Sequence, residues 1–340
     1  MGNLNWAILG PGSIAHEFAE GMRGMNREIY AVGARSLEKG QAFASQYGIE
    51  NVYDDFDKML ADPAIDVVYI ATPHSNHYEF IMKSLHNGKH VLAEKAITVS
   101  SKELNEINVL AKEKGLIVKE AMTIFHMPLY KKLREIVESG AIGKLKIIQV
   151  AFGSAKEKDP KNRFYNMDLA GGALLDIGTY ALSFARYFLS ETPDEVLTTM
   201  KKFETGVDEQ SGILLKNNEE ELAVVSLSFR AKMPKRGVIA CEEGFITVDE
   251  YPRASRATVT HTATGKVEEI EVGETSKALE YEITAMEESI ATGENMTYQL
   301  TNDVIAIMSD VRTQWGIKFP FSTNINQLNY LLFLGRRNEI

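Results

Sequence analysis

The sequence has only one cysteine, Cys241, among its 340 residues. An internal disulfide needs two cysteines and a thiolate metal cluster needs several, so both are excluded. We expect Cys241 to be a buried, unreactive thiol. Long apolar runs are also missing, and none approaches the roughly 20 residues of a membrane-spanning helix. The first apolar segment starts at Trp6, which leaves no room for a signal peptide, so the sequence predicts a cytoplasmic protein without a membrane segment.

Positive charge is in short supply, with 37 Lys and Arg against 47 Asp and Glu, a net charge of −10. This balance argues against nucleic acid as a partner, although local cations could still bind an anionic cofactor. Histidines are few, and no pair of them shares a helix with a supporting acid, so a metal enzyme is the least favoured class. Six of the seven lie early in the chain: His16, His74, His77, His86, His90 and His126.

Against these absences stands one strong local signal, the stretch Trp6–Phe18. Apolar residues run into a Gly-Pro-Gly turn and then recur at helical spacing, which predicts strand, tight turn and helix. The first glycine permits the turn, the second lets a pyrophosphate approach the backbone, and a small residue lets helix and strand pack closely. Amides at the helix start would face the anion. The predicted cofactor-binding residues here are Gly10, Gly12, Ser13, Ile14 and Ala15. The alternative is an ordinary βα turn.

The second strand, residues 28–34, bears on which dinucleotide is bound. NAD-binding domains carry an acidic residue near the end of this strand for the ribose 2′-hydroxyl, whereas an Arg accommodates a 2′-phosphate. Here no acid stands between Ile29 and Leu37, and the strand leads into Arg35 and Ser36. We therefore favour NADP, with NAD still possible. The alternative reading makes Arg35 a solvated loop cation.

Strands and helices continue to alternate as far as residue 120, which predicts six strands in a doubly wound parallel sheet. The fourth strand ends in a polar loop with Thr72, Pro73 and His77, and the fifth ends in Glu94 and Lys95. Open α/β sheets bind ligands at these carboxyl ends of their strands. Lys95 follows a buried strand there, so its placement distinguishes it from solvated lysines.

The pattern changes in the second half. Later strands come as hairpins around Asn217-Asn218, Glu243-Gly244 and Thr264-Gly265, and two amphipathic helices follow. We expect a Rossmann domain over residues 1–122, then an α+β domain over residues 123–340 with a large, mostly antiparallel open sheet. A sheet covered on one face only would bury the other by self-association, as a homodimer or larger homo-oligomer.

Between the hairpins and the first half lies the segment 169–180, which carries Asp176 and Tyr180 four positions apart. Residues at this spacing share one helical face, so an acid and a phenol could serve proton transfer together. The alternative, favoured from the residues alone, is a helix cap and a packed aromatic ring.

Taken together, the glycine turn, Thr72-Pro73 with His77, the Glu94-Lys95 pair and Asp176-x-Gly178-x-Tyr180 resemble the Gfo/Idh/MocA oxidoreductase family over nearly the whole chain. Most members of the family have His at the place of Tyr180. A Tyr there resembles the branch of the family that acts on dihydrodiols and D-xylose. The resemblance implies a Rossmann domain, a second domain whose open sheet forms a dimer interface, and Lys95, Asp176 and Tyr180 as catalytic residues around nicotinamide and substrate.

The chain departs from the family in two places. The family's Glu-Lys-Pro is Glu94-Lys95-Ala96 here, and residues 123–125 replace Trp and Arg found in the dihydrodiol branch, which leaves substrate contacts there open. Equally open is whether Arg163, Phe164 and Tyr165 touch substrate or merely cover the cleft.

The sequence thus favours an NADP-dependent dehydrogenase or reductase acting on CH–OH groups of a sugar or cyclic polyol. In this hypothesis Tyr180 gives or takes the proton, Lys95 orients substrate and stabilises a phenolate, and Asp176 holds hydroxyls, although the first two roles could be exchanged. The alternatives are an NAD-dependent inositol-type dehydrogenase and a non-catalytic NADP-sensing regulator.

Overall fold

The computed structural model describes residues 4–323. The first part of the chain forms a six-stranded, wholly parallel sheet in the order β3-β2-β1-β4-β5-β6, the doubly wound topology expected from the sequence. Its strands are β1 (Trp6–Leu9), β2 (Ile29–Gly33), β3 (Asn51–Tyr53), β4 (Val67–Ile70), β5 (His90–Glu94) and β6 (Val118–Ala121). Strands β1 and β4 are buried along their whole length, as in a sheet with helices on both faces.

Five helices connect these strands: α1 (Ser13–Gly24), α2 (Leu37–Tyr47), α3 (Phe56–Ala61), α4 (His74–His86) and α5 (Ser101–Lys114). The side chains of Ser36, Asp55 and Ser100 accept backbone N–H groups at the starts of α2, α3 and α5. Gly115 ends α5 in the left-handed region, with φ +64°. Local caps therefore set the helix boundaries.

The second part of the chain forms an eight-stranded sheet in the order β14-β13-β12-β11-β7-β10-β9-β8. Its strands are β7 (Leu145–Gly153), β8 (Glu195–Lys202), β9 (Asp208–Lys216), β10 (Leu222–Ser228), β11 (Met233–Cys241), β12 (Gly244–Asp249), β13 (Arg256–His261) and β14 (Val267–Glu271). All neighbouring strands are antiparallel except β7 and β10, which run parallel. The large, mostly antiparallel sheet is thus confirmed.

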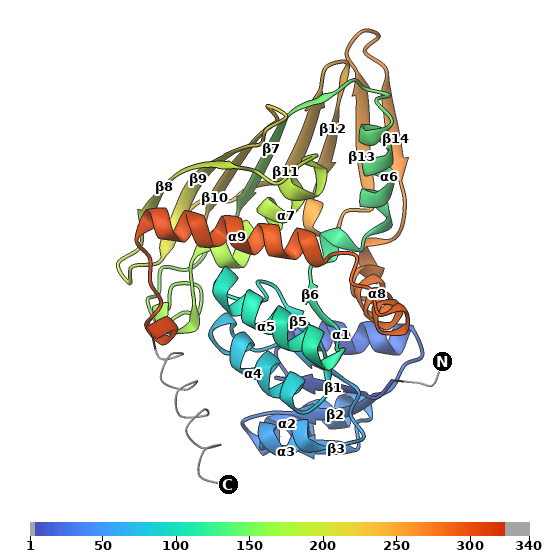
Figure 1. Cartoon of the computed structure of the whole chain (residues 1–340), viewed down its shortest axis with the longest axis vertical. Helices are drawn as coiled ribbons and strands as arrows, with labels where there is room; N and C mark the ends of the chain where they lie inside the picture. Colours follow the sequence, from blue (N-terminus) through green and yellow to red (C-terminus); the bar gives the residue numbers. More distant parts are fainter. Residues whose placement is uncertain (1–3, 324–340) are drawn as a thin grey trace.

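Four α-helices accompany this sheet: α6 (Pro128–Glu138), α7 (Thr179–Phe188), α8 (Ala278–Thr292) and α9 (Tyr298–Trp315). Helix α7 packs on β7, β10 and β11, while α9 packs on β8 and α7 and also on α5 of the first part. Figure 1 shows α9 running between the large sheet and the Rossmann part, with α8 beside α1. Helices α8 and α9 belong to the second part of the chain but pack against the first, so a domain boundary between residues 122 and 123 remains a prediction. Residues 324–340 of the predicted second domain lie outside the described range.

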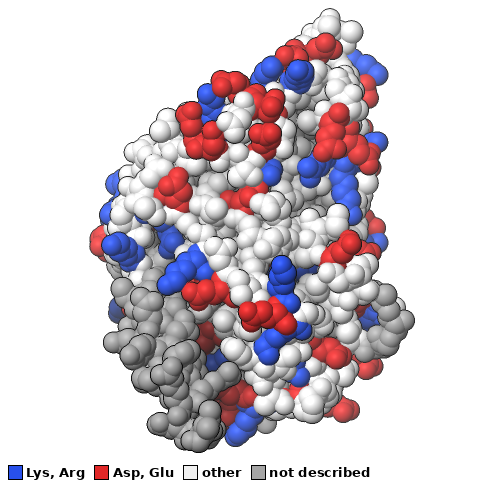
Figure 2. Space-filling model, viewed as in Figure 1, with Lys and Arg blue, Asp and Glu red and all other residues white. Residues whose placement is uncertain are grey.

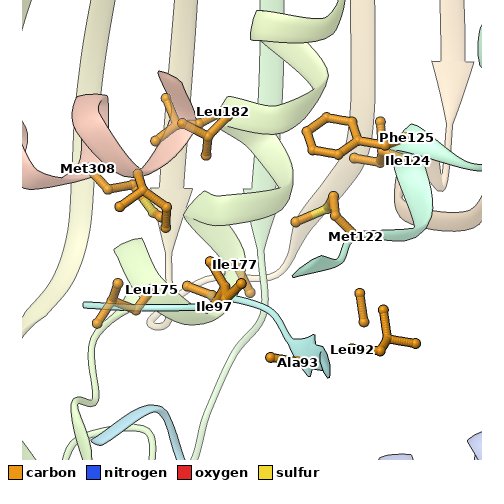
Figure 3. Packing of buried hydrophobic residues seen from close by; sticks show 14 of the residues in the cluster. Leu92, Ala93, Ile97, Met122, Ile124, Phe125, Leu175, Ile177, Leu182 and Met308 are labelled. Atoms are coloured by element: carbon orange, nitrogen blue, oxygen red, sulfur yellow. The ribbon is translucent and has the colours of Figure 1, made fainter. Parts of the chain in front are cut away.

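A continuous apolar core joins the two parts. Figure 3 shows Ile97, from the segment after β5, beside Leu175 and Ile177 of the π-helical turn η3 (Leu174–Gly178), with Met308 of α9 nearby. All four side chains are at most 3% exposed. Apolar packing therefore fixes the two segments that carry Lys95 and Asp176.

The surface of the described residues carries both signs of charge. On the side seen in Figure 2, Lys and Arg are interspersed with Asp and Glu. No helix within residues 4–323 is long and apolar enough to cross a membrane.

Cys241 is half-buried, not fully buried as expected, and burial raises the pKa of its thiol to about 11, so the thiolate is disfavoured.

Candidate active site

A cleft of about 390 Å³ lies at the carboxyl ends of the parallel strands, between the two sheets. Open α/β folds bind ligands at this place. Residues from both parts line it: Gly12, Ser13, Ile14, Glu17, Ala71, Thr72, Pro73, His74, Glu94, Lys95, Arg163, Phe164, Leu169, Ala170, Gly171, Gly172, Asp176 and Tyr180. Nine of the sequence-predicted site residues are among them.

The glycine turn forms one end of the cleft. Gly10 has φ +98°, and a Cβ there would lie 3.1 Å from the Ala71 carbonyl oxygen, so the position favours glycine. A Cβ on Gly12 would meet only that same carbonyl at 3.9 Å, which leaves the approach open. No side chain caps α1, and its first turn contains no acid. A helix start with free amides beside an open backbone fits a pyrophosphate.

Ala15, Arg35 and Ser36 do not line this cleft. Ala15 is fully buried beneath the turn, where its small side chain lets α1 approach the sheet. Arg35 is exposed just beyond β2, and Ser36 caps α2 by accepting the Lys39 N–H at 3.4 Å. Because β2 neighbours β1 in the sheet, both residues lie at the same edge as the glycine turn.

Two histidines brace the loop after β4. His77 is completely buried, with its ring nitrogens 2.8 Å from the Thr72 carbonyl and 3.0 Å from the Ala96 carbonyl. It therefore shapes the loop and does not face the cleft, unlike its expected role as a cofactor contact. The neighbouring His74 does line the cleft, and one ring nitrogen lies 3.1 Å from the Lys95 carbonyl. Burial, helped by His77 and Lys95, lowers the pKa of His74 to about 3, so it is neutral.

Lys95, Asp176 and Tyr180 come together at the other end of the cleft. Lys95 Nζ donates to the Asp176 carbonyl oxygen at 2.8 Å and to its Oδ1 at 3.4 Å. The same Nζ lies 4.6 Å from the centroid of the Tyr180 ring. The Lys95 and Asp176 side chains are 15% and 13% exposed, so the ion pair is largely shielded from water but still reachable from the cleft.

The charges of these three groups determine their protonation. Burial alone would lower the pKa of Lys95, but Tyr180, Asp176 and Glu94 outweigh it, so the pKa is raised and the ammonium persists. Burial would raise the pKa of Asp176, yet the surrounding cations, Lys95 foremost, bring it below its usual value. For Tyr180 burial prevails over the opposing charge of Lys95, so its pKa is raised and it is a neutral phenol.

Glu94 fixes the backbone at Lys95 through hydrogen bonds. Its carboxylate accepts the Tyr69 hydroxyl and, at 3.3 Å, the Lys95 backbone N–H. Burial raises the pKa of Glu94, although Tyr69 and Lys95 oppose the shift. Glu94 thus fixes the end of β5, from which Lys95 projects.

The turn that carries Asp176 is held by a residue that sequence reasoning missed. Asp208, at the start of β9, is 3% exposed, and its Oδ2 accepts the Leu174 N–H at 2.7 Å. Gly172 has φ +118°, and a Cβ there would collide with the Asp208 carboxylate. Asp208 therefore caps the turn from a different strand. No local pattern could have indicated this contact, since 34 positions separate Asp208 from Leu174.

The loop left open by the sequence divides into two roles. Arg163 and Phe164 line the cleft, whereas Tyr165 is fully buried with its ring 4.1 Å from that of Phe203. Residues 123–125, by contrast, are buried in the core and do not line the cleft.

Sequence comparison places both parts of the chain in one family. Residues 4–122 match the oxidoreductase family with an NAD-binding Rossmann fold, and residues 130–247 match the GFO/IDH/MocA C-terminal domain. The chain is 28% identical to trans-1,2-dihydrobenzene-1,2-diol dehydrogenase of Xenopus tropicalis, over 93% of this chain and 99% of the relative. It is 31% identical to the Danio rerio protein of the same name, over 73% of this chain and 75% of the relative.

Solved structures share the fold at lower identity. Levoglucosan dehydrogenase in complex with NADH matches with a TM-score of 0.84 at 20% identity, over 92% of this chain and 97% of the other. A 3-ketoreductase from Actinomadura kijaniata, in complex with NADP and TDP-benzene, matches with a TM-score of 0.83 at 20% identity, over 91% and 97%. The resemblance expected from the motifs is thus confirmed, and the chain belongs to the Gfo/Idh/MocA oxidoreductase family.

Proposed function

We propose that this oxidoreductase is an NADP-dependent dehydrogenase or reductase that acts on a CH–OH group of a sugar or cyclic polyol. One observation carries the proposal: the cleft joins a glycine turn fit for a dinucleotide to a buried group of ammonium, carboxylate and phenol. The dehydrogenase names of the relatives agree with this chemistry. A sensor that only binds the cofactor would not need the second group.

The cofactor would lie along the carboxyl edge of the parallel sheet. Amides at Ser13 and Ile14 would hold the pyrophosphate beside the open backbone of Gly12, and Thr72 and Pro73 would flank the cofactor as it runs toward Lys95. Arg35, with no acid beside it on the strand end, would take the 2′-phosphate. The nicotinamide, when bound, supplies the hydride chemistry.

The remaining residues would manage the proton and the substrate. In reduction, the neutral Tyr180 phenol donates its proton to the carbonyl oxygen of the substrate, and in oxidation the phenolate accepts the hydroxyl proton. Lys95, whose Nζ lies 4.6 Å from the centroid of the Tyr180 ring, stabilises that phenolate and orients the oxygen of the substrate. Asp176, charged and partly accessible, accepts hydrogen bonds from neighbouring hydroxyls of the substrate.

The test uses the purified full-length protein, NADP or NAD, and a panel of aldoses, cyclic diols and inositols. We expect both a thermal shift and turnover, followed by the absorbance of reduced nicotinamide, with NADP and an aldose or cyclic diol. Turnover with NAD and inositols only would replace the proposal with an inositol-type dehydrogenase. Cofactor binding without turnover of any compound would favour a sensor.

The preference for NADP over NAD is tested with a variant of Arg35. Replacing Arg35→Ala removes the cation opposite the 2′-phosphate, so Kd for NADP should rise by about tenfold or more while Kd for NAD stays within about twofold. Lys112→Ala, which removes an exposed cation in the last turn of α5, is the matched control. Equal losses for both cofactors, or none, would contradict the assignment of Arg35.

We also propose a homodimer formed through the open face of the large sheet. One row of outward-facing side chains crosses five paired strands: Leu197, Leu214, Val224, Gln149 and Val238. A parallel row contains Leu222, Ile147, Ala240 and Phe245. Leu197 is 61% exposed and Val224 39%. A broad apolar sheet face of this kind is stabilised by burial against a second copy.

A further inference from the structure

Two cations lie at the substrate end of the cleft: Arg163 lines it, and Lys156 contacts the same Phe164 ring. Lys156 and Arg163 belong to the segment after β7, and within residues 4–323 no Asp or Glu lies at ion-pair distance from either. Their charged neighbours are paired: Lys95 with Asp176, Arg253 with Glu17 at 2.6 Å. Likewise Lys235 pairs with Glu250 at 3.0 Å and Arg230 contacts Glu209 at 3.8 Å.

Both cations lie against one aromatic ring. Lys156 Nζ is 3.9 Å from the centroid of the Phe164 ring, and Arg163 Cζ is 4.3 Å from it. The ring attracts each cation, but two like charges on one ring repel each other. Burial lowers the pKa of Lys156; the charge of Asp176 opposes this shift, and Arg163 and Lys95 add to it. An anion placed beside the ring would relieve this repulsion.

The backbone of Lys156 and the ring of Phe164 are held in place before any ligand arrives. The Lys156 backbone N–H donates to the Phe229 carbonyl at 2.8 Å, and Arg230 donates to the Lys156 carbonyl at 3.3 Å. The Phe164 ring meets the Phe229 ring edge-on, 5.7 Å between centroids. Little conformational entropy is therefore lost in fixing the Phe164 ring when an anion binds here.

The position of these cations points to the substrate and not to the cofactor. Arg163 and Phe164 line the cleft together with Asp176 and Tyr180, and both cations lower the pKa of Asp176. They come from the second part of the chain, whereas the pyrophosphate has the amides of α1 and the 2′-phosphate has Arg35. An anionic group near Lys156 and Arg163 would sit next to the hydroxyls bound by Asp176.

We infer that the substrate is a polyhydroxy compound with an anionic group, a sugar acid or sugar phosphate, whose negative charge binds Arg163 and Lys156 beside Phe164. This inference rests on the proposed function and narrows its substrate class. The neutral diols and aldoses of that class would then be weaker substrates than their charged counterparts.

The experiment compares D-glucose with D-glucuronate, D-gluconate and D-glucose 6-phosphate on protein saturated with NADP. Calorimetric binding and kcat/KM are both measured for the wild type, for the double variant Lys156→Gln with Arg163→Gln, and for Lys161→Gln, an exposed cation of the same loop, as control. At least one anion should bind tenfold more tightly than glucose. The double variant should lose most of that preference, the control should keep it, and a higher salt concentration should weaken it.

Three results would overturn the inference. The first is that no anion binds better than glucose. The second is that the preference for the anion survives in the double variant. The third is that the double variant weakens NADP binding as much as anion binding. The last result would assign the cations to the cofactor. Because binding is measured apart from turnover, a protein that binds an anion but oxidises or reduces nothing would refute the proposed function and leave the anion site supported.

Discussion

At the scale of single residues, Tyr180 is the group whose environment decides the chemistry. It lies against Lys95, its pKa is raised by burial, and the phenol therefore keeps its proton at neutral pH. Lys95 keeps its proton as well, because its pKa is raised despite its burial. The sequence left open whether Tyr180 or Lys95 exchanges the proton with the substrate. These protonation states favour Tyr180 as the acid, with Lys95 as a permanent positive charge beside it.

Removing either group should therefore slow the reaction sharply. Tyr180→Phe should lower kcat by about 10²–10⁴, the usual contribution of a positioned acid or base, and Lys95→Met should lower it similarly. Cofactor binding, measured by nicotinamide fluorescence quenching, should remain. Tyr53→Phe, on β3, serves as control, because it removes a phenol hydroxyl that donates to Asp62 and does not line the cleft. Wild-type turnover in both cleft variants would refute the assignment.

The pKa of Tyr180 also fixes the sign of the pH dependence. A donor with a pKa above the usual 10.0 is protonated throughout the neutral range, so the rate of reduction should be flat and fall only in alkali. The rate of oxidation needs the phenolate, whose fraction grows about tenfold per pH unit below the pKa, so it should rise steadily. Steady-state rates in both directions from about pH 6 to about pH 10 check this. An oxidation rate that levels off near neutrality would indicate a different base.

At the scale of elements, the turn η3 is positioned from outside itself. Its Leu174 N–H is bound by Asp208 of β9, and Gly172 leaves the space that the carboxylate occupies. The sequence suggested that Asp176 and Tyr180 share an ordinary helical face, whereas η3 is π-helical and the α-helix begins only at Thr179. π-helical turns are often found at functional sites.

Asp208→Ala should consequently affect both stability and catalysis. A buried N–H without a partner costs about 1–3 kcal/mol, so the free energy of unfolding in urea should fall by that amount. The turn would also lose its attachment, and kcat should fall at least tenfold while Kd for the cofactor stays unchanged, since α1 is not involved. Asp208→Asn, which retains an acceptor, should restore much of the rate. Gln210→Ala, exposed on the same strand, is the control.

Whether an element could be predicted depended on how local its signals are. Adjacent residues indicated the glycine turn and the hairpins with Gly at the turn, and the structure contains both. Strand β8 was missed because its charged and Thr residues alternate weakly and it is stabilised by pairing with β9. The parallel pairing of β7 with β10 was likewise invisible in a pattern of hairpins.

The site shows the same limit. Lys95 and Asp176 are 81 positions apart, and only the resemblance to a family suggested that they meet. His74 could have been found from its place in the polar loop after β4, but sequence reasoning selected His77, which turned out to be buried. The contact between Asp208 and Leu174, and the stacking of two cations on Phe164, depend on tertiary packing that no spacing encodes.

At the scale of the whole molecule, the open sheet face is the feature with the clearest consequence. The double variant Leu197→Glu with Val224→Lys places charges in the apolar row, and burying them against a second copy would be costly. We expect the wild type to have the mass of a dimer by light scattering and the variant to have half of it. Val109→Glu, on an exposed apolar residue of α5, should leave the mass unchanged. A monomeric wild type would contradict the proposed dimer.

The bond between Asp208 and Leu174 has a consequence for motion. A turn closed by its own backbone can fluctuate alone, but one tied to a strand of the neighbouring sheet moves only when that strand moves. The acid and the phenol that it carries should therefore shift together as one unit, and their mutual distance should vary less than their distance to the parallel sheet. The Leu174 amide, buried and bound to a carboxylate, should exchange its hydrogen with solvent as slowly as the interior of β9, and its exchange rate reports how firmly the substrate end of the cleft is held.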